Sequence, residues 1–224
     1  MDPVETGRTT AERAEGPGVA QPRRRPRADG ERSRQRILET AARLATVEGI
    51  DGLSIGRLAQ ATGMSKSGLF AHFASKAELQ LAAIDTARSI FLADVVVPAE
   101  KEPPGLARLE RLCERMLSHI DRRVFPGGCF FAVVGSEQAG KPGPVLDRVV
   151  EVGTEWVARL AEAVQEAQER GELDGSIKPE QLAFELNAYL QMADLVFQLG
   201  DPDGIGRGRA AIRTRLDNAR PARS

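Results

Sequence analysis

The stretch SIGRLAQATGMSKSGLFAHFASK, residues 54–76, decides the fold of this 224-residue chain. It holds one short run with apolar side chains at helical spacing, a glycine, and a second short run. Ser54 and Ser65 are favoured N-cap residues, because a serine hydroxyl accepts a hydrogen bond from a free N–H of the first helical turn. Gly63 suits the tight turn between the runs, since glycine tolerates left-handed backbone. The stretch therefore predicts two short helices joined by a turn.

Two helices joined in this way form a helix-turn-helix, whose second helix can enter a DNA major groove. The expected second helix covers about 66–71. Lys66 and the hydroxyls of Ser65 and Ser67 can donate to phosphates or bases, and the small Gly68 lets the helix backbone approach base edges. We expect the apolar Leu69 and Phe73, by contrast, to face the core.

Charge is distributed unevenly along the chain. The formal charge of the whole chain is −1, but residues 22–76 contain 11 Lys and Arg against 5 Asp and Glu, a net of +6. The remaining residues therefore sum to −7. A basic N-terminal third on an acidic body indicates a module that binds a polyanion. Chance clustering of surface charge is the alternative.

Residues 1–30 are rich in Gly, Pro, Arg and Glu and have few large apolar side chains, so we expect a disordered arm. The arm ends in PRRRPR, residues 22–27. Two interpretations stay open: a basic arm that reaches a phosphate backbone or minor groove, and a solvated tail. The first 21 residues lack the apolar segment of a signal peptide, and no run approaches the length of a membrane span. We expect a cytoplasmic protein that does not contact membranes.

Several classes of site are disfavoured by the residues that the chain contains. Cys113 and Cys129 lie far apart, without the Cys or Cys/His spacing of a zinc site. They are expected to be small buried residues in a reducing compartment. The chain has 2 histidines and lacks a phosphate loop, a nucleophile elbow and a metal cluster. We therefore expect no enzyme, no metal and no cofactor.

The rest of the chain is predicted to be helical. A helix from about Glu31 should end before Gly49, and a Ser75/Glu78 capping box should open a helix that runs to Val97 and stops before Pro98. The last helix should be capped by Asp201 and Pro202. The remaining helices are expected at about 106–124, 128–139, 144–170 and 179–199, and the last one at about 202–218. Without any hairpin signal, the predicted fold class is all-α.

Residues 36–81 resemble the DNA-binding domain of the TetR family of transcriptional regulators. The resemblance rests on RILETAARLATVEGIDGLSIGRLAQATGMSKSGLFAHFASKAEL, and the segments GGCFFAVV and KPGPVLDRV are looser matches to the family's second domain. The matching positions are Ala41, Gly49, Leu53, Ile55, Leu58, Ala59, Gly63, Ser65, Leu69, His72, Phe73, Lys76 and Leu79. The resemblance implies a three-helix helix-turn-helix domain at 31–76, a larger helical effector-binding and dimerisation domain at 77–219, and a tail at 220–224.

The resemblance also implies which residues contact DNA. They are Ser54, Arg57, Ser65, Lys66, Ser67, Gly68, Phe70, His72 and Lys76. The family usually has tyrosine where this chain has Phe70, so a phenol-to-phosphate hydrogen bond is unavailable, although apolar contact with a sugar or thymine methyl remains. His72 is either a phosphate contact or a structural residue.

The helical remainder is expected to hold an effector pocket and a dimer interface. Pocket candidates are Phe91, Met116, His119, Ile120, Cys129, Phe130, Phe131, Val134 and Trp156, for which ordinary core packing is the alternative. The helix at 179–199 is apolar nearly all round, which favours a homodimer formed with the last helix. The overall prediction is a ligand-responsive repressor that binds a near-palindromic double-stranded operator. A nonspecific basic-arm DNA binder and a helical small-molecule enzyme are the alternatives.

Overall fold

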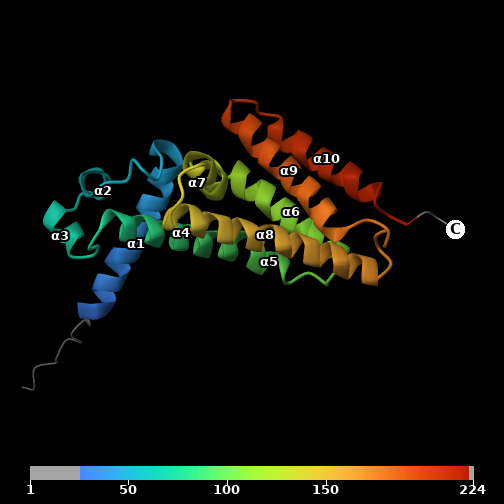
Figure 1. The fold of residues 1–224 in the computed structure, drawn as a ribbon, viewed down its shortest axis with the longest axis horizontal. Coiled ribbons are helices and arrows are strands. Elements are labelled where there is room, and N and C mark those ends of the chain that lie inside the picture. Colours follow the sequence, from blue (N-terminus) through green and yellow to red (C-terminus); the bar gives the residue numbers. More distant parts are fainter. Residues whose placement is uncertain (1–25, 222–224) are drawn as a thin grey trace, which may run out of the picture.

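The computed structural model describes residues 26–221, and within them all regular structure is helical (Figure 1). The predicted all-α fold is confirmed. The first three helices are α1 (Pro26–Glu48), α2 (Ile55–Thr62) and α3 (Lys66–Phe70), and they lie at one end of the molecule. The chain segment after α10 leads away at the opposite end.

Helix α1 begins five residues before the start expected near Glu31. Residues 26–30, assigned to the disordered arm from their composition, are therefore helical. A proline is compatible with a first helical turn, because its missing N–H has no partner there and its φ is already helical. The rest of the expected arm, residues 1–25, lies outside the described residues. The prediction that α1 ends before Gly49 is confirmed, and Gly49 has a φ of 80°.

Helix α4 (Lys76–Phe91) continues into a π-helical turn, η1 (Leu92–Val96), and then into α5 (Val97–Ala99). The expectation that this helix stops before Pro98 is wrong. Proline has no N–H, so it cannot bond to the carbonyl group four residues earlier, that of Asp94. The backbone carbonyl oxygen of Asp94 instead accepts a hydrogen bond from Arg115, whose Nε lies 2.8 Å away. The π-helical turn and the Arg115 hydrogen bond together allow the helix to continue past Pro98.

The C-terminal helices are α6 (Leu106–Asp121), α7 (Phe130–Gln138), α8 (Pro144–Glu169), α9 (Pro179–Gln198) and α10 (Gly204–Asp217). They confirm the helices expected in this region, except that α6 ends at Asp121 rather than near 124 and that the start of α10 differs. The N-cap of α10 is Asp203, not the predicted pair Asp201 and Pro202. The Asp201 carboxylate accepts from the backbone N–H of Asp203 at 3.0 Å, which forms a turn before the helix rather than a cap on it.

The apolar core has two parts. One is formed by α1, α2, α3 and the first half of α4, and the other by the C-terminal helices. Phe125, Phe130, Val134 and Val149, however, belong to the first part although they come from the C-terminal region. Helix α7 thus completes the core of the N-terminal helices. This packing joins the two halves of the molecule.

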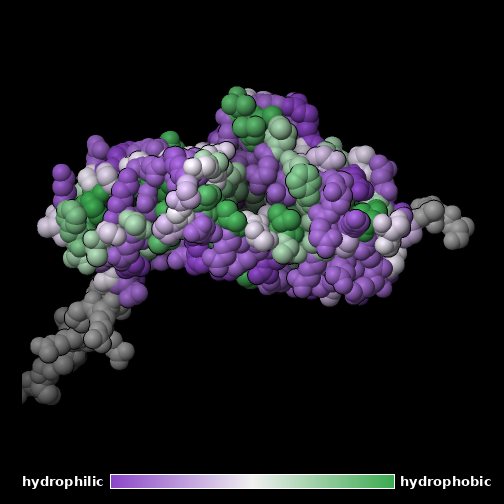
Figure 2. All heavy atoms as spheres, viewed as in Figure 1, coloured by the Kyte–Doolittle hydropathy of each residue, from purple (hydrophilic) through white to green (hydrophobic). Residues whose placement is uncertain are grey.

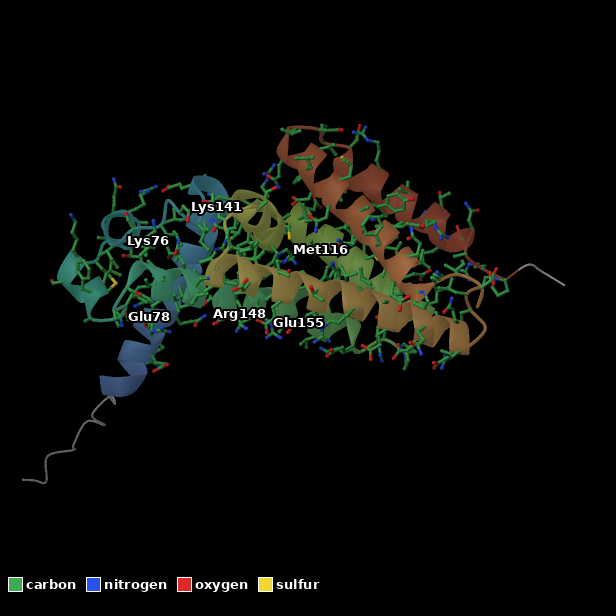
Figure 3. The ribbon with its side chains drawn as sticks, in the orientation of Figure 1. Lys76, Glu78, Met116, Lys141, Arg148 and Glu155 are labelled. Atoms are coloured by element: carbon green, nitrogen blue, oxygen red, sulfur yellow. The ribbon has the colours of Figure 1, made fainter. Side chains whose placement is uncertain are left out.

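Helices α4 and α8 lie side by side and are bridged by ion pairs, and Arg148 and Glu155 lie along this contact (Figure 3). Arg148 pairs with Asp85 at 2.7 Å, and Arg88 of α4 pairs with Glu155 at 2.7 Å. Partly exposed pairs contribute about 0–1 kcal/mol each, so they orient the two helices more than they stabilise them. Within residues 26–221, no helix has the length and apolarity required to cross a membrane.

Candidate nucleic-acid interface and ligand cavity

Helices α2 and α3 form the turn that the sequence predicts. The Ser54 hydroxyl accepts from the backbone N–H of Arg57 at 3.2 Å, and that of Ser65 accepts from the N–H of Gly68 at 3.1 Å. Gly63 ends α2 with a φ of 68°, in the left-handed region that penalises residues with a Cβ. The predicted N-caps and turn are therefore confirmed. Helix α3 is left at the surface, at the far end of the molecule from α10 (Figure 1).

The outer face of α3 and its flanks carries most of the side chains expected to contact DNA. Those exposed are Ser54, Ser65, Lys66, Ser67, Phe70 and Lys76, and those half-buried are Arg57, Gly68 and His72. Phe70 is 63% exposed, whereas Leu69 and Phe73 are at most 2% exposed. The inward direction predicted for Leu69 and Phe73 is confirmed. An apolar ring exposed at the end of a surface helix is available for contact with a partner.

Three of these residues already have partners inside the protein. The Arg57 guanidinium pairs with both carboxylate oxygens of Glu48, with Nε–Oε distances of 2.9 and 2.8 Å. Hydrogen bonding to Glu48 raises the pKa of Arg57 further. The Lys76 ammonium donates to the carbonyl oxygen of Asp51. The His72 ring contacts the Phe73 ring, with 6.3 Å between their centroids. A phosphate would have to compete with Glu48 for Arg57, while Lys76 keeps two further N–H donors.

The turn between α1 and α2 is bound by the C-terminal domain. The Glu137 carboxylate of α7 accepts from the backbone N–H groups of Ile50 and Asp51, at 2.7 and 2.9 Å. Lys141 pairs with the Asp51 side chain at 3.0 Å, so Lys76 and Lys141 approach the same turn (Figure 3). Hydrogen bonding to Lys141 lowers the pKa of the Asp51 carboxyl group. A carboxylate that binds two successive N–H groups fixes this turn relative to α7.

The loop between α6 and α7 contacts α1 on one side and α9 on the other. Arg43 of α1 donates to the Val124 carbonyl at 2.8 Å, and the Gly127 N–H donates to Thr46 at 3.1 Å. A Cβ at Gly127 would lie 1.7 Å from the Thr46 carbonyl oxygen, so only glycine fits there. On the other side, the Cys129 N–H donates to Asp194 of α9 at 2.8 Å. The loop before α7 is thereby anchored to both α1 and α9, while Glu137 anchors the C-terminal end of α7 to the α1–α2 turn.

A cavity of about 120 Å³ lies between α4, α6, α7, α8 and α9. Of the residues predicted for an effector pocket, Phe91, Met116, Cys129, Phe131 and Trp156 line it. Phe91 is the centre of an aromatic cluster: its ring contacts Trp156 at 5.2 Å and Phe131 at 6.2 Å between centroids, both edge-to-face. Phe131 also contacts Phe130, at 5.3 Å. These rings lead from the cavity to the helix-turn-helix core, to which Phe130 belongs.

The other four predicted pocket residues do not line this cavity. Phe130 and Val134 pack in the helix-turn-helix core and Ile120 in the C-terminal core. His119 is 2% exposed, and its Nδ1 lies 2.7 Å from an Asp94 carboxylate oxygen. Burial lowers the pKa of His119, so its neutral ring donates to Asp94. Although burial opposes it, hydrogen bonding from His119 and Arg122 lowers the pKa of Asp94. These four residues have structural positions.

Comparison with known proteins identifies the group of proteins to which the chain is related. Residues 37–83 match the family described as bacterial regulatory proteins, tetR family, and residues 105–212 match the tetracyclin repressor-like C-terminal domain. The transcriptional regulator AcuR of Cereibacter sphaeroides is 30% identical over 175 residues, which cover 75% of this chain and 78% of that protein. The chain belongs to the TetR family.

Solved structures, among them one of a TetR regulator, have the same fold. A TetR regulator from Chloroflexus aurantiacus superposes with a TM-score of 0.78, at 25% identity, over 85% of this chain and 96% of its own. AibR, solved with isovaleryl coenzyme A and operator DNA, gives 0.65 at 23% identity, over 80% and 95%. A regulator from Saccharomonospora viridis, solved with choline, gives 0.71 at 20% identity, over 86% and 100%.

Some residues of the domain contact and of the cavity were not predicted from the sequence. Glu137 and Lys141 belong to a segment whose contact with the α1–α2 turn depends on tertiary packing. The cavity lining that was missed comes from α7, α8 and α9: Ala132, Val149, Val152, Gly153, Asn187 and Gln191. Gly153, within the long α8, is the one local signal that was available, because glycine weakens a helix interior unless its lack of a side chain is used.

Proposed function

We propose that this TetR-family protein is a homodimeric repressor, released from a near-palindromic operator by a small molecule. The observation that carries the proposal is the surface helix α3, with Lys66, Ser67 and Phe70 exposed, on a domain whose core is completed by α7 of the ligand-binding half. A helix-turn-helix presented in this way reads DNA from the N-terminal end of its second helix. Phosphate contacts by Ser54, His72 and Lys76 would set its position on the duplex.

The proposed dimer surface is the exposed side of α9. Phe184, Met192, Leu195 and Leu199 are each more than half exposed, and their spacing places them on one face of the helix. In Figure 2, hydrophobic atoms gather where α9 turns towards α10. A contiguous apolar face of this kind marks a protein–protein contact, and a two-fold dimer would present α3 twice, about 34 Å apart.

The proposed response to a ligand passes through α7 as well as α4. Phe131 of α7 lines the cavity and packs against both parts of the core, and Glu137 of the same helix holds the α1–α2 turn. A ligand that favours another position of α7 would move the helix-turn-helix, and α4 would tilt with it. Such a ligand acts only through its different affinity for the two arrangements. AibR and the choline-binding regulator support a small-molecule response in a protein of this fold.

Operator binding is tested by fluorescence anisotropy with the DNA upstream of the protein's own gene, at a salt concentration that suppresses nonspecific binding. The proposal expects a preference of about 1,000-fold or more over a scrambled duplex. A protein without residues 1–28 should keep that preference and lose mainly salt-sensitive affinity. If the truncated protein lost all binding, the nonspecific basic-arm interpretation would replace the repressor.

A further inference from the structure

The cavity lined by the aromatic cluster has no charged side chain in its lining. The side chains that line it are apolar except for Asn187 and Gln191, both neutral amides of α9. Burial raises the pKa of the lining Cys129 thiol to about 11, so this side chain is neutral as well. A charged ligand would lose its hydration without meeting an opposite charge among these side chains, which is costly. The lining therefore favours a neutral molecule.

One hydrogen-bond donor of the lining has a defined orientation. The Asn187 side-chain oxygen accepts from the Trp156 indole N–H at 3.1 Å. An indole can only donate, so this contact fixes the amide orientation and leaves the Asn187 NH2 group as a donor. Asn187 is half-buried at the cavity, where a carbonyl, ether or hydroxyl oxygen of a ligand can accept from it.

Gly153 indicates that the cavity volume beside α8 is kept free of side chains. It lies in the interior of α8, where glycine costs about 1 kcal/mol relative to alanine. Close packing does not require this glycine, because a Cβ built on it meets no atom within 4 Å. Gly208 of α10 is the contrasting case, since a Cβ there would lie 2.5 Å from the Ala193 side chain. A side chain at position 153 would occupy cavity space instead.

From these features we infer that the cavity binds a small neutral molecule with a hydrogen-bond-accepting oxygen and a compact apolar body. Its size follows from the volume: an apolar cavity of about 150 Å³ holds a six-carbon ring, so about 120 Å³ holds roughly five non-hydrogen atoms. The oxygen accepts from Asn187, and the apolar body packs against Phe91, Phe131 and Trp156. The inference rests on the proposed function, because it gives the chemical class of the ligand to which the repressor responds.

The test uses thermal unfolding of the full-length protein without DNA. The neutral probes are isobutyramide, cyclopentanone and tert-butanol, and isobutyrate is the charged counterpart of isobutyramide with the same number of non-hydrogen atoms. At saturation at least one neutral probe should raise Tm by about 2 °C or more, and isobutyrate should require at least a tenfold higher concentration for the same rise. An equal response to isobutyrate, or no rise with any neutral probe, would overturn the inference.

A variant locates the binding. Gly153→Leu fills the cavity and should abolish the rise in Tm, whereas Gly30→Leu, another helical glycine with open space beside it, should retain it. If Gly153→Leu kept the full response, the probe would bind elsewhere and the inference would fail. Operator anisotropy is measured separately: a protein that binds the probes but no operator would contradict the proposed function and leave the ligand class standing.

Discussion

The contact between Glu137 and the α1–α2 turn gives a prediction with a defined magnitude. In a Glu137→Ala variant, the N–H groups of Ile50 and Asp51 lose the carboxylate that accepts from both of them. A hydrogen bond to a charged group contributes about 1.5–3 kcal/mol, but Asp51 is exposed, so water can replace its bond. Ile50 is buried, and its N–H would remain without an acceptor. We therefore expect a loss of about 2–3 kcal/mol in the free energy of unfolding.

In a chain of this size, that loss corresponds to a fall in Tm of about 4–12 °C. Glu137→Gln keeps one accepting oxygen without the charge, so its Tm should lie between those of Glu137→Ala and the wild type. The matched control is Glu169→Ala, which removes an exposed carboxylate whose hydrogen-bond partner is the side chain of Gln165. Differential scanning calorimetry gives Tm, and anisotropy should show weaker operator binding for Glu137→Ala. A Tm equal to that of Glu169→Ala would refute the role given to this contact.

Three further predictions concern other parts of the molecule. Phe70→Tyr restores the hydroxyl usual in the family and should tighten operator binding by at most about 1 kcal/mol in an anisotropy titration. Unchanged or weaker binding would show that the exposed Phe70 ring has an apolar role of its own. Leu195→Glu places a charge in the proposed dimer surface and should give a monomer in analytical ultracentrifugation, whereas Val47→Glu, at an exposed position of α1, should remain a dimer. Because burial lowers the pKa of His119, the folded protein binds a proton at this ring less readily than the unfolded chain does. The free energy of unfolding should therefore decline as pH falls below about 6.5. Urea titrations of His119→Asn should show a smaller decline than those of the wild type between about pH 7 and 5.

The local features of the fold were accessible from the sequence. The serine N-caps at positions 54 and 65 and the left-handed Gly63 follow from side-chain chemistry within a few residues, and the structure has them all. The inward Leu69 and Phe73 follow from the same local pattern. Local rules failed at Pro98, where the helix continues because Arg115, distant in sequence, satisfies the carbonyl that the proline leaves free.

The candidate sites were accessible only in part, for the same reason. The aromatic residues of the cavity stand out by type, but Asn187 and Gln191 have no distinctive spacing and become lining residues only when α9 packs against α8. Glu137 likewise resembles any surface glutamate until α7 meets the α1–α2 turn. His119 and Phe130 were predicted for the pocket because of their residue type. Packing instead places His119 in a hydrogen bond with Asp94 and Phe130 in the helix-turn-helix core.

The central claim is that α3 reads an operator as part of a two-fold dimer. Hydroxyl-radical footprinting on the DNA upstream of the protein's own gene tests it most directly. The account predicts two protected half-sites related by a near-palindrome, with centres about 10 base pairs or a multiple of that apart, and their loss when Lys66 and Ser67 on the exposed face of α3 are both changed to alanine. Uniform protection without half-sites, or a footprint unchanged in that double variant, would contradict the account.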